Sequence, residues 1–216
     1  HALATKLNMY YGTTAFFTFD ASNSNTGIGT ASPSRTLSVF DTTPIVALYN
    51  STTGTASNDG FQLQLSSDDG YLWNYESGGH TIFGTANTER MRIDSSGNIQ
   101  IAKTARADDT VGHSLQADGL AVHTRDGNEA MFLNRKSSDG KILSLRKDNT
   151  EVGAIGIQSG GLTVDGETNH SGIRFSASSF LPRKNNADVN GTVDLGTTDG
   201  RWKDLYLGGG LIIGGT

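Results

Sequence analysis

The sequence predicts an all-β protein, and three observations support that prediction. Runs in which apolar and polar residues alternate are numerous and short. Glycine accounts for 28 of the 216 residues, roughly twice its usual share of about 7%. Helical periodicity is scarce, and its best example, Ala86 to Arg92, covers little more than one turn. We therefore expect short strands joined by tight turns.

The expected strands follow from an alternation with period two, which places one face of each strand against a core and the other in water. The clearest of these runs are Phe61–Leu65, Met91–Ile93, Ile99–Ile101, Ile142–Leu145, Ile155–Ile157 and Leu205–Leu207.

The expected turns are marked by Asp-Gly pairs, which begin at positions 59, 69, 118, 126, 139, 165 and 199, and by Asn190-Gly191. Both residues of such a pair tolerate positive φ, as two-residue hairpin turns require. The pairs therefore predict antiparallel hairpins throughout the chain.

A weak internal repeat suggests two β modules. The segment containing Leu63 and Leu65 resembles the one containing Leu143 and Leu145, and each is preceded by an Asp-Gly pair. We expect an N-terminal attachment or linker segment at 1–25, a first module at 26–105, a connector at 106–116, and a second module with the end of a shaft at 117–216.

The supply of apolar side chains is low for a self-contained core. Hydrophobic residues make up 35% of the chain, whereas about 45–50% is usual when glycine is counted with them. Three copies around one axis would each need to supply only part of a shared core. The closing stretch fits such packing, and its expected contact residues between copies are Trp202, Leu205, Leu207, Leu211, Ile212 and Ile213.

Charge and composition argue against several classes of protein. The net charge of −5 shows no basic patch for nucleic acid. The absence of cysteine excludes disulfides and thiolate metal sites. No apolar run approaches the roughly 18 residues of a membrane-spanning helix, so we expect no membrane insertion.

Several motifs resemble elements that recur in bacteriophage tail fibres. They are TGIGTASPS at 26–34 followed by LSV at 37–39, ERMRIDSSGN at 89–98, NRKSSDG at 134–140 with RKDNTEVG at 146–153, HSGIRF at 170–175, DLG at 194–196 and RWKDLYL at 201–207. They occur in the order usual for that family and extend over roughly 26 to 216. The resemblance implies an elongated homotrimeric shaft, intertwined or similar to a β-prism or β-helix, that serves host attachment. In several relatives such a shaft precedes an intramolecular chaperone domain.

One stretch is a candidate for receptor or glycan contact. In an extended strand, Tyr71, Trp73 and Tyr75 lie on one face, and flat amphipathic rings provide large contact areas at low entropic cost. The alternative is that these rings pack within the trimer, since aromatic residues are common in strands.

We predict no catalytic residues, no cofactor and no metal site. Adjacent carboxylates such as Asp68-Asp69 point to opposite faces of a strand, so they cannot form the carboxyl pair of a glycosidase. The five histidines at positions 1, 80, 113, 123 and 170 are scattered, although threefold symmetry could still assemble a site from a single axial histidine.

These observations favour a tail-fibre segment of a phage virion, extracellular when mature. Its expected partners are two further copies of itself, other tail or baseplate proteins, and a host surface receptor such as a polysaccharide or an outer-membrane component. The alternatives are a tailspike-like polysaccharide depolymerase, and a head fibre or bacterial surface adhesin of similar architecture.

Overall fold

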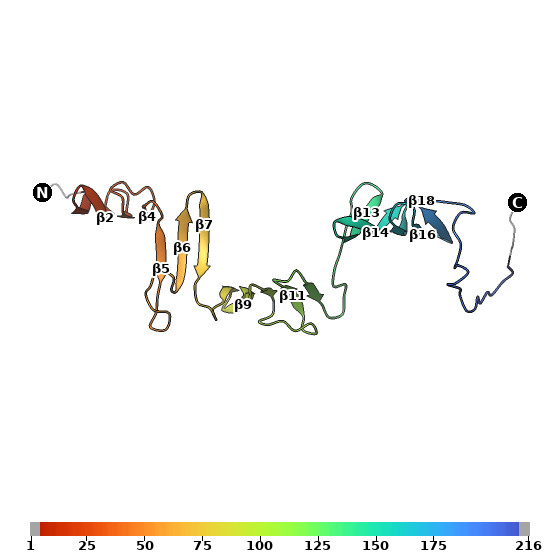
Figure 1. Ribbon diagram of the computed structural model, residues 1–216. Coiled ribbons are helices and arrows are strands. Elements are labelled where there is room, and N and C mark those ends of the chain that lie inside the picture. The colour runs from red at the N-terminus through yellow and green to blue at the C-terminus, as the bar shows by residue number, and fades with distance from the viewer. Residues whose placement is uncertain (1–4, 212–216) are drawn as a thin grey trace. The chain divides into compact units, whose positions relative to one another are not determined.

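A computed structural model describes residues 5–211 of the chain. These residues form eighteen β-strands and no helix, which confirms the all-β prediction (Figure 1). The strands form four sheets, which we name A to D in chain order.

Sheets A, B and C belong to the first part of the chain. Sheet A contains β1 (Lys6–Tyr11), β2 (Thr14–Asp20), β3 (Asn25–Ile28) and β4 (Leu37–Val39). Sheet B contains β5 (Ile45–Leu48), β6 (Phe61–Ser66) and β7 (Asp69–Asn74). Sheet C contains β8 (Thr81–Thr85), β9 (Thr88–Ile93), β10 (Ile99–Ile101), β11 (Gly112–Leu115) and β12 (Ala121–Thr124).

Sheet D follows in the second part of the chain. It contains β13 (Gly140–Lys147), β14 (Thr150–Gln158), β15 (Gly161–Gly166), β16 (Ser171–Phe175), β17 (Phe180–Lys184) and β18 (Ala187–Asp188). In every sheet, strands that are consecutive in the sequence are neighbours in space.

Neighbouring strands are antiparallel except for β3 and β4, which pair in parallel. The connection between these two strands contains the second glycine of the TGIGTASPS motif. Gly29 has a φ of +76°, and a Cβ atom there would lie 1.9 Å from the carbonyl oxygen of Phe40. Only glycine fits at this position, because any other residue would clash with the backbone of the segment that follows β4.

The chain divides into two compact units, His1–Ala130 and Met131–Thr216. Within the first unit, β1 and β2 pair with one another and β2 pairs with β3, so the expected N-terminal segment 1–25 contributes to sheet A. The expected connector 106–116 includes β11, which pairs with β10 and β12.

Several hairpin turns differ from the prediction. Asp69-Gly70 and Asp165-Gly166 lie inside β7 and β15, and Ser67-Asp68 forms the turn before β7. Both residues have positive φ in the turns Ala86-Asn87, Asp148-Asn149, Ser159-Gly160 and Asn185-Asn186. Asparagine tolerates this conformation better than most residues do, so a tight turn does not need an Asp-Gly pair. The Asp-Gly pattern therefore does not by itself locate where the chain reverses. The same geometry explains why Ala86 begins a turn and not a helix.

Five of the six alternating runs lie in strands, namely in β6, β9, β10, β13 and β14. The prediction was wrong for Leu205–Leu207, which forms no strand. In the described part of the chain no strand pairs with this run. Without a neighbouring strand, an alternating sequence has no partners for its backbone hydrogen bonds.

Each sheet exposes apolar side chains on one face, and a buried polar side chain lies at the centre of the other face. Directly opposite residues on neighbouring strands point to the same side, so register defines the faces. In sheet A, Met9, Phe17, Ile28 and Val39 form one row across all four strands, and the adjacent row on the other face has Thr18 at its centre. Thr18 is 0% exposed, whereas Met9 is 49% exposed.

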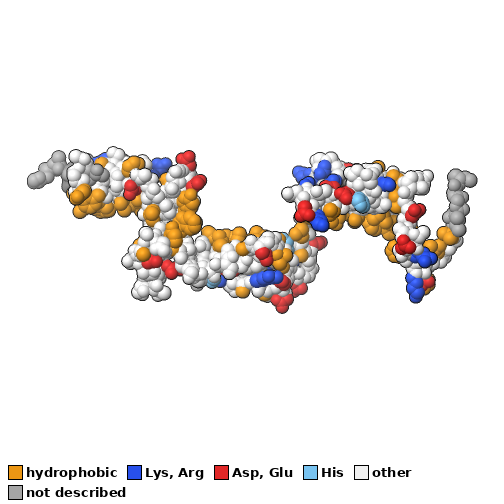
Figure 2. All heavy atoms as spheres, in the orientation of Figure 1, with side chains coloured by type: hydrophobic (Ala, Val, Ile, Leu, Met, Phe, Trp, Pro, Cys, Tyr) orange, Lys and Arg blue, Asp and Glu red, His pale blue; other side chains and the backbone are white. Residues whose placement is uncertain are grey.

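The other three sheets repeat this arrangement. The largest fully buried side chains are Gln62 of sheet B, Gln100 and Ser114 of sheet C, and Thr18 of sheet A. Among the described residues the only buried hydrophobic side chains are those of Ala15 and Ala154. Figure 2 shows hydrophobic side chains gathered over β5–β7 and along one side of the β13–β18 sheet. The described residues thus fold into sheets but form no hydrophobic core.

Candidate functional site

The largest surface feature is the set of exposed apolar sheet faces. In sheet B, Val46, Leu63 and Leu72 lie directly opposite one another on the three strands, and all three are exposed. Leu48 and Leu65 extend the same face. Apolar side chains at these positions gain free energy only when a neighbouring surface removes them from water.

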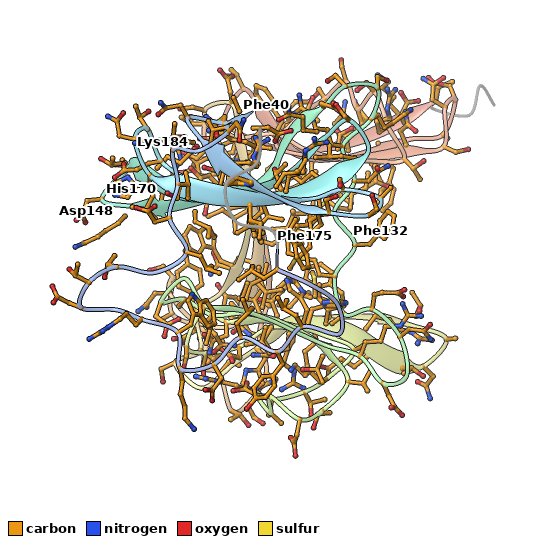
Figure 3. All side chains as sticks on the ribbon, turned by 90° about the vertical axis from the view of Figure 1, so that its right-hand side faces the viewer. Phe40, Phe132, Asp148, His170, Phe175 and Lys184 are labelled. Atoms are coloured by element: carbon orange, nitrogen blue, oxygen red, sulfur yellow. The ribbon has the colours of Figure 1, made fainter. Side chains whose placement is uncertain are left out.

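Sheet D has the widest row of this kind. Leu143, Ile155, Val164, Ile173 and Pro182 lie opposite one another on five consecutive strands. A second row contains Leu162, Phe175 and Phe180. The two rings meet edge to face with their centroids 5.0 Å apart, yet Phe180 is 70% exposed. In Figure 3 Phe175 projects from the underside of the sheet as drawn.

The aromatic row lies on the opposite face of sheet B from these leucines. Trp73 pairs with Gln62 and Tyr71 with Gln64, whereas Leu72 pairs with Leu63. The row follows β7, an edge strand of the sheet, and Tyr75 comes directly after it. The prediction that the three aromatic residues lie on one side is consistent with their stacking.

The rings of the row stack on each other along the strand. The centroids of Tyr71 and Trp73 are 5.5 Å apart with an interplanar angle of 10°, and those of Trp73 and Tyr75 are 5.8 Å apart at 29°. Each ring therefore covers part of its neighbour's face. The stacked rings leave part of their surface open to solvent, and Trp73 and Tyr75 are exposed.

The polar face of sheet D is held by a buried ion-pair network that the sequence analysis did not anticipate. The Arg183 guanidinium donates to Asp165 at 2.6 Å, to Asp188 at 2.9 Å and to the side-chain oxygen of Gln158 at 2.5 Å. Arg174 donates to both carboxylate oxygens of Asp188. The Arg183 side chain is only 3% exposed. The network covers this face mainly with polar side chains, beside the buried Ala154, and the opposite face is the one that lacks a cover.

Ion pairs and hydrogen bonds keep several carboxyl groups ionised. Arg92 lowers the pKa of Glu89, Arg106 lowers that of Asp108, and Arg174 together with Arg183 lowers that of Asp188. The Ser22 hydroxyl, with help from Lys6, lowers the pKa of Asp20 to about 2. The acid of a glycosidase needs a raised pKa instead, so these carboxyls are suited to structural pairing.

The closing stretch, which begins at Gly191, is exposed at every residue from 201 to 211. Trp202, Leu205, Leu207 and Leu211 are exposed, and no described strand includes them. An open hollow of about 860 Å³ is lined by Leu195, Trp202, Leu205 and Tyr206, among others. Ile212 and Ile213, also expected at the contact between copies, lie outside the described residues.

Comparisons with known proteins show no relative. A scan against family models, a search of curated proteins and a search of solved structures found no match.

Cross-strand proximity is what sequence reasoning missed. It placed Tyr71, Trp73 and Tyr75 on one side of a single extended segment, of which β7 contains the first two, because their spacing of two is local. Arg183 and Asp165 are eighteen residues apart and meet only through the register of β15, β16 and β17. The one available signal was that both charged residues lie within strands. A charged side chain on a covered face of a strand needs a partner of opposite charge.

Proposed function

We propose that this chain is a segment of a homotrimeric β fibre on a phage virion and that it serves attachment to the host cell. The observation that carries the proposal is that all four sheets expose apolar side chains on one face, while the buried side chains at the centre of the other face are polar. The resemblance of the motifs between 26 and 216 to tail-fibre elements supports the viral context.

The missing cover is supplied by further copies of the same chain. All four sheets expose apolar side chains along the sequence, so the need for a cover recurs in each of them. Identical copies around an axis solve the problem for every sheet at once, since each copy covers its neighbour. We expect three copies, as the resemblance implies.

The aromatic row is the part of this fibre that we expect to meet the receptor. It lies on the face of sheet B opposite Leu63 and Leu72, so closing the apolar face against other copies leaves the row outward. Exposed tryptophan and tyrosine are the side chains that most often dominate the binding energy of an interface. Three rows on one fibre, and several fibres on one particle, would strengthen a weak contact by multivalency.

Binding of the fluorescently labelled protein to a panel of bacterial strains tests this assignment. We expect at least one strain to bind the protein, and Trp73→Ala to weaken that binding by about tenfold or more with the oligomeric mass unchanged. Tyr49→Ala, at an exposed tyrosine outside the row, is the matched control and should bind normally. Full binding by Trp73→Ala would remove the row from the receptor site, and dissociation of the assembly by this change would assign the row to packing instead.

A further inference from the structure

Two histidines that lie ten residues apart in the sequence meet across sheet C. His113 of β11 is directly opposite His123 of β12. Their Nδ1 atoms are 2.7 Å apart and their ring centroids 4.9 Å apart. Directly opposite residues of an antiparallel pair project to the same side, so both imidazoles emerge side by side from the same face.

The surroundings of the pair favour a ligand over a structural role. Met91 of β9 and Ile101 of β10 continue the same cross-strand row, so the imidazoles stand on the apolar face of the sheet. Among the described residues, the only side-chain hydrogen bond that either ring makes is the one between the two Nδ1 atoms. His113 is exposed and His123 is half-buried.

The geometry points to a two-histidine site for a divalent transition metal, and we propose that His113 and His123 bind Zn²⁺, Ni²⁺ or Cu²⁺ together. Imidazole nitrogen is a preferred ligand of these ions. Two nitrogens bound at about 2.0–2.1 Å to one tetrahedral ion lie about 3.3 Å apart. The two Nδ1 atoms therefore need to separate by only about 0.6 Å, which small side-chain rotations provide. The proton between the two Nδ1 atoms moves through water to the Nε2 atom of the same ring, so both ligands are neutral imidazoles.

The remaining coordination positions belong to water or to a chelator. No group of three or more histidine, cysteine, aspartate or glutamate side chains suited to a metal ion occurs within residues 5–211. A site with two protein ligands needs only one chain. The pair lies at the β11–β12 edge of the apolar face, so the proposal requires that this edge stay accessible when other copies cover the face. Such a site should bind its ion with moderate affinity and should prefer ions that favour nitrogen over oxygen ligands.

A bound ion would fasten an edge of the sheet. Strand β12 is the outer strand of sheet C, next to β11, and edge strands are held by one neighbour only. The metal would join the two strands through their side chains in addition to the backbone ladder. We therefore expect the amide protons of β12 to exchange more slowly with the metal than without it.

Nickel binding to the untagged full chain tests the site. The background protein carries His1→Ala and His170→Gln, so that the pair and His80 are the remaining histidines. His80 is kept because its Nδ1 accepts a hydrogen bond from the amide of Ser95 at 3.2 Å. We expect this protein to bind Ni²⁺-nitrilotriacetate, which leaves two adjacent coordination positions open, and to gain thermal stability on addition of Ni²⁺ or Zn²⁺.

His113→Gln and His123→Gln should each weaken nickel binding by about tenfold or more, since each leaves a single ligand. His123→Cys retains two ligands and should keep Zn²⁺ binding, which guards against loss of the fold in the glutamine variants. Slower exchange in β12 should appear with the metal and vanish in His113→Gln. Absence of nickel binding at millimolar Ni²⁺, or equal binding by the background protein and His123→Gln, would overturn the proposal.

Discussion

Single residues hold this chain together through polar contacts where most proteins use apolar ones. The centres of the covered faces are occupied by Thr18, Gln62, Gln100 and Arg183, all at most 2% exposed. Buried polar groups are tolerated when they are hydrogen-bonded. The Arg183 network meets that condition, since its guanidinium has three acceptors. The Thr18 hydroxyl and the Gln100 side-chain nitrogen do not meet it, since neither has a hydrogen-bond partner among the described residues.

Removal of the Arg183 guanidinium should therefore be costly. Arg183→Met leaves Asp165 and Asp188 without this partner, and the loss of one member of a buried ion pair typically costs about 3–5 kcal/mol. Urea unfolding followed by circular dichroism measures the change. Arg35→Met is the control, because Arg35 lies in an exposed turn and should change stability little. Adding Asp165→Leu to Arg183→Met should restore part of the loss; a loss below about 1 kcal/mol for Arg183→Met would contradict the structural role of the network.

Asp20 should make the stability depend on acid. Its pKa of about 2 in the folded chain lies below the ordinary value of 3.8. Its contribution is therefore complete at pH values above about 4 and is lost as the pH falls from 4 toward 2. Between pH 4 and pH 2, the melting temperature of the wild-type chain should fall more steeply than that of Asp20→Asn. Parallel curves for the two proteins would show that Asp20 has no such linkage.

At the scale of elements, the turns set the strand register, and the register sets which side chains each sheet face contains. The hairpin between β8 and β9 turns at Ala86 and Asn87 with φ values of 49° and 59°. Alanine in the left-handed region costs about 1–2 kcal/mol. Each sheet combines such a turn-defined register with one apolar face, and register alone decides which side chains that face contains.

Ala86→Gly should stabilise the protein by roughly 0.5–1 kcal/mol, because relief of the strained φ outweighs the added entropy of the unfolded chain. Ala86→Val should destabilise it. Ala47→Gly, within β5, should have the opposite sign to Ala86→Gly, since glycine weakens a strand. Thermal unfolding of the three variants checks these signs, and a lower melting temperature for Ala86→Gly than for the wild type would contradict the assigned turn.

The apolar face of sheet B should be needed for association. Leu63 is exposed in the single chain, so Leu63→Lys leaves the sheet itself intact but places a charge where another copy is proposed to pack. We expect sedimentation to show at least about a tenfold weaker association. Gln64→Lys changes the opposite face of the same strand and should leave association unchanged. Equal association of both variants would exclude this face as an interface.

The sequence was sufficient for the strands whose alternation is local and insufficient for what depends on register. Leu63 and Leu65 reveal β6 and its apolar face without any partner. The burial of Gln62 on the other face was not foreseeable, since alternation suggests that the polar side faces water. Leu205 and Leu207 alternate equally well yet form no strand, because a strand also needs a neighbour to pair with. The contact between His113 and His123 depends on the β11–β12 register, which a five-residue connection does not specify.

At the scale of the whole molecule, all four sheets expose apolar side chains, and the only hydrophobic side chains buried among the described residues are those of Ala15 and Ala154. Such a chain either gathers copies of itself or remains marginally stable, since folded sheets without a core gain little from the hydrophobic effect. Assembly and stability should therefore be a single property of this protein, and dilution should lower both together.

Light scattering coupled to size-exclusion chromatography at micromolar concentration tests this central claim most directly. The account predicts a particle of about 68 kDa, three times the 22.8 kDa of one chain, whose unfolding temperature rises with protein concentration. A folded, stable particle with the mass of a single chain under the same conditions would contradict it.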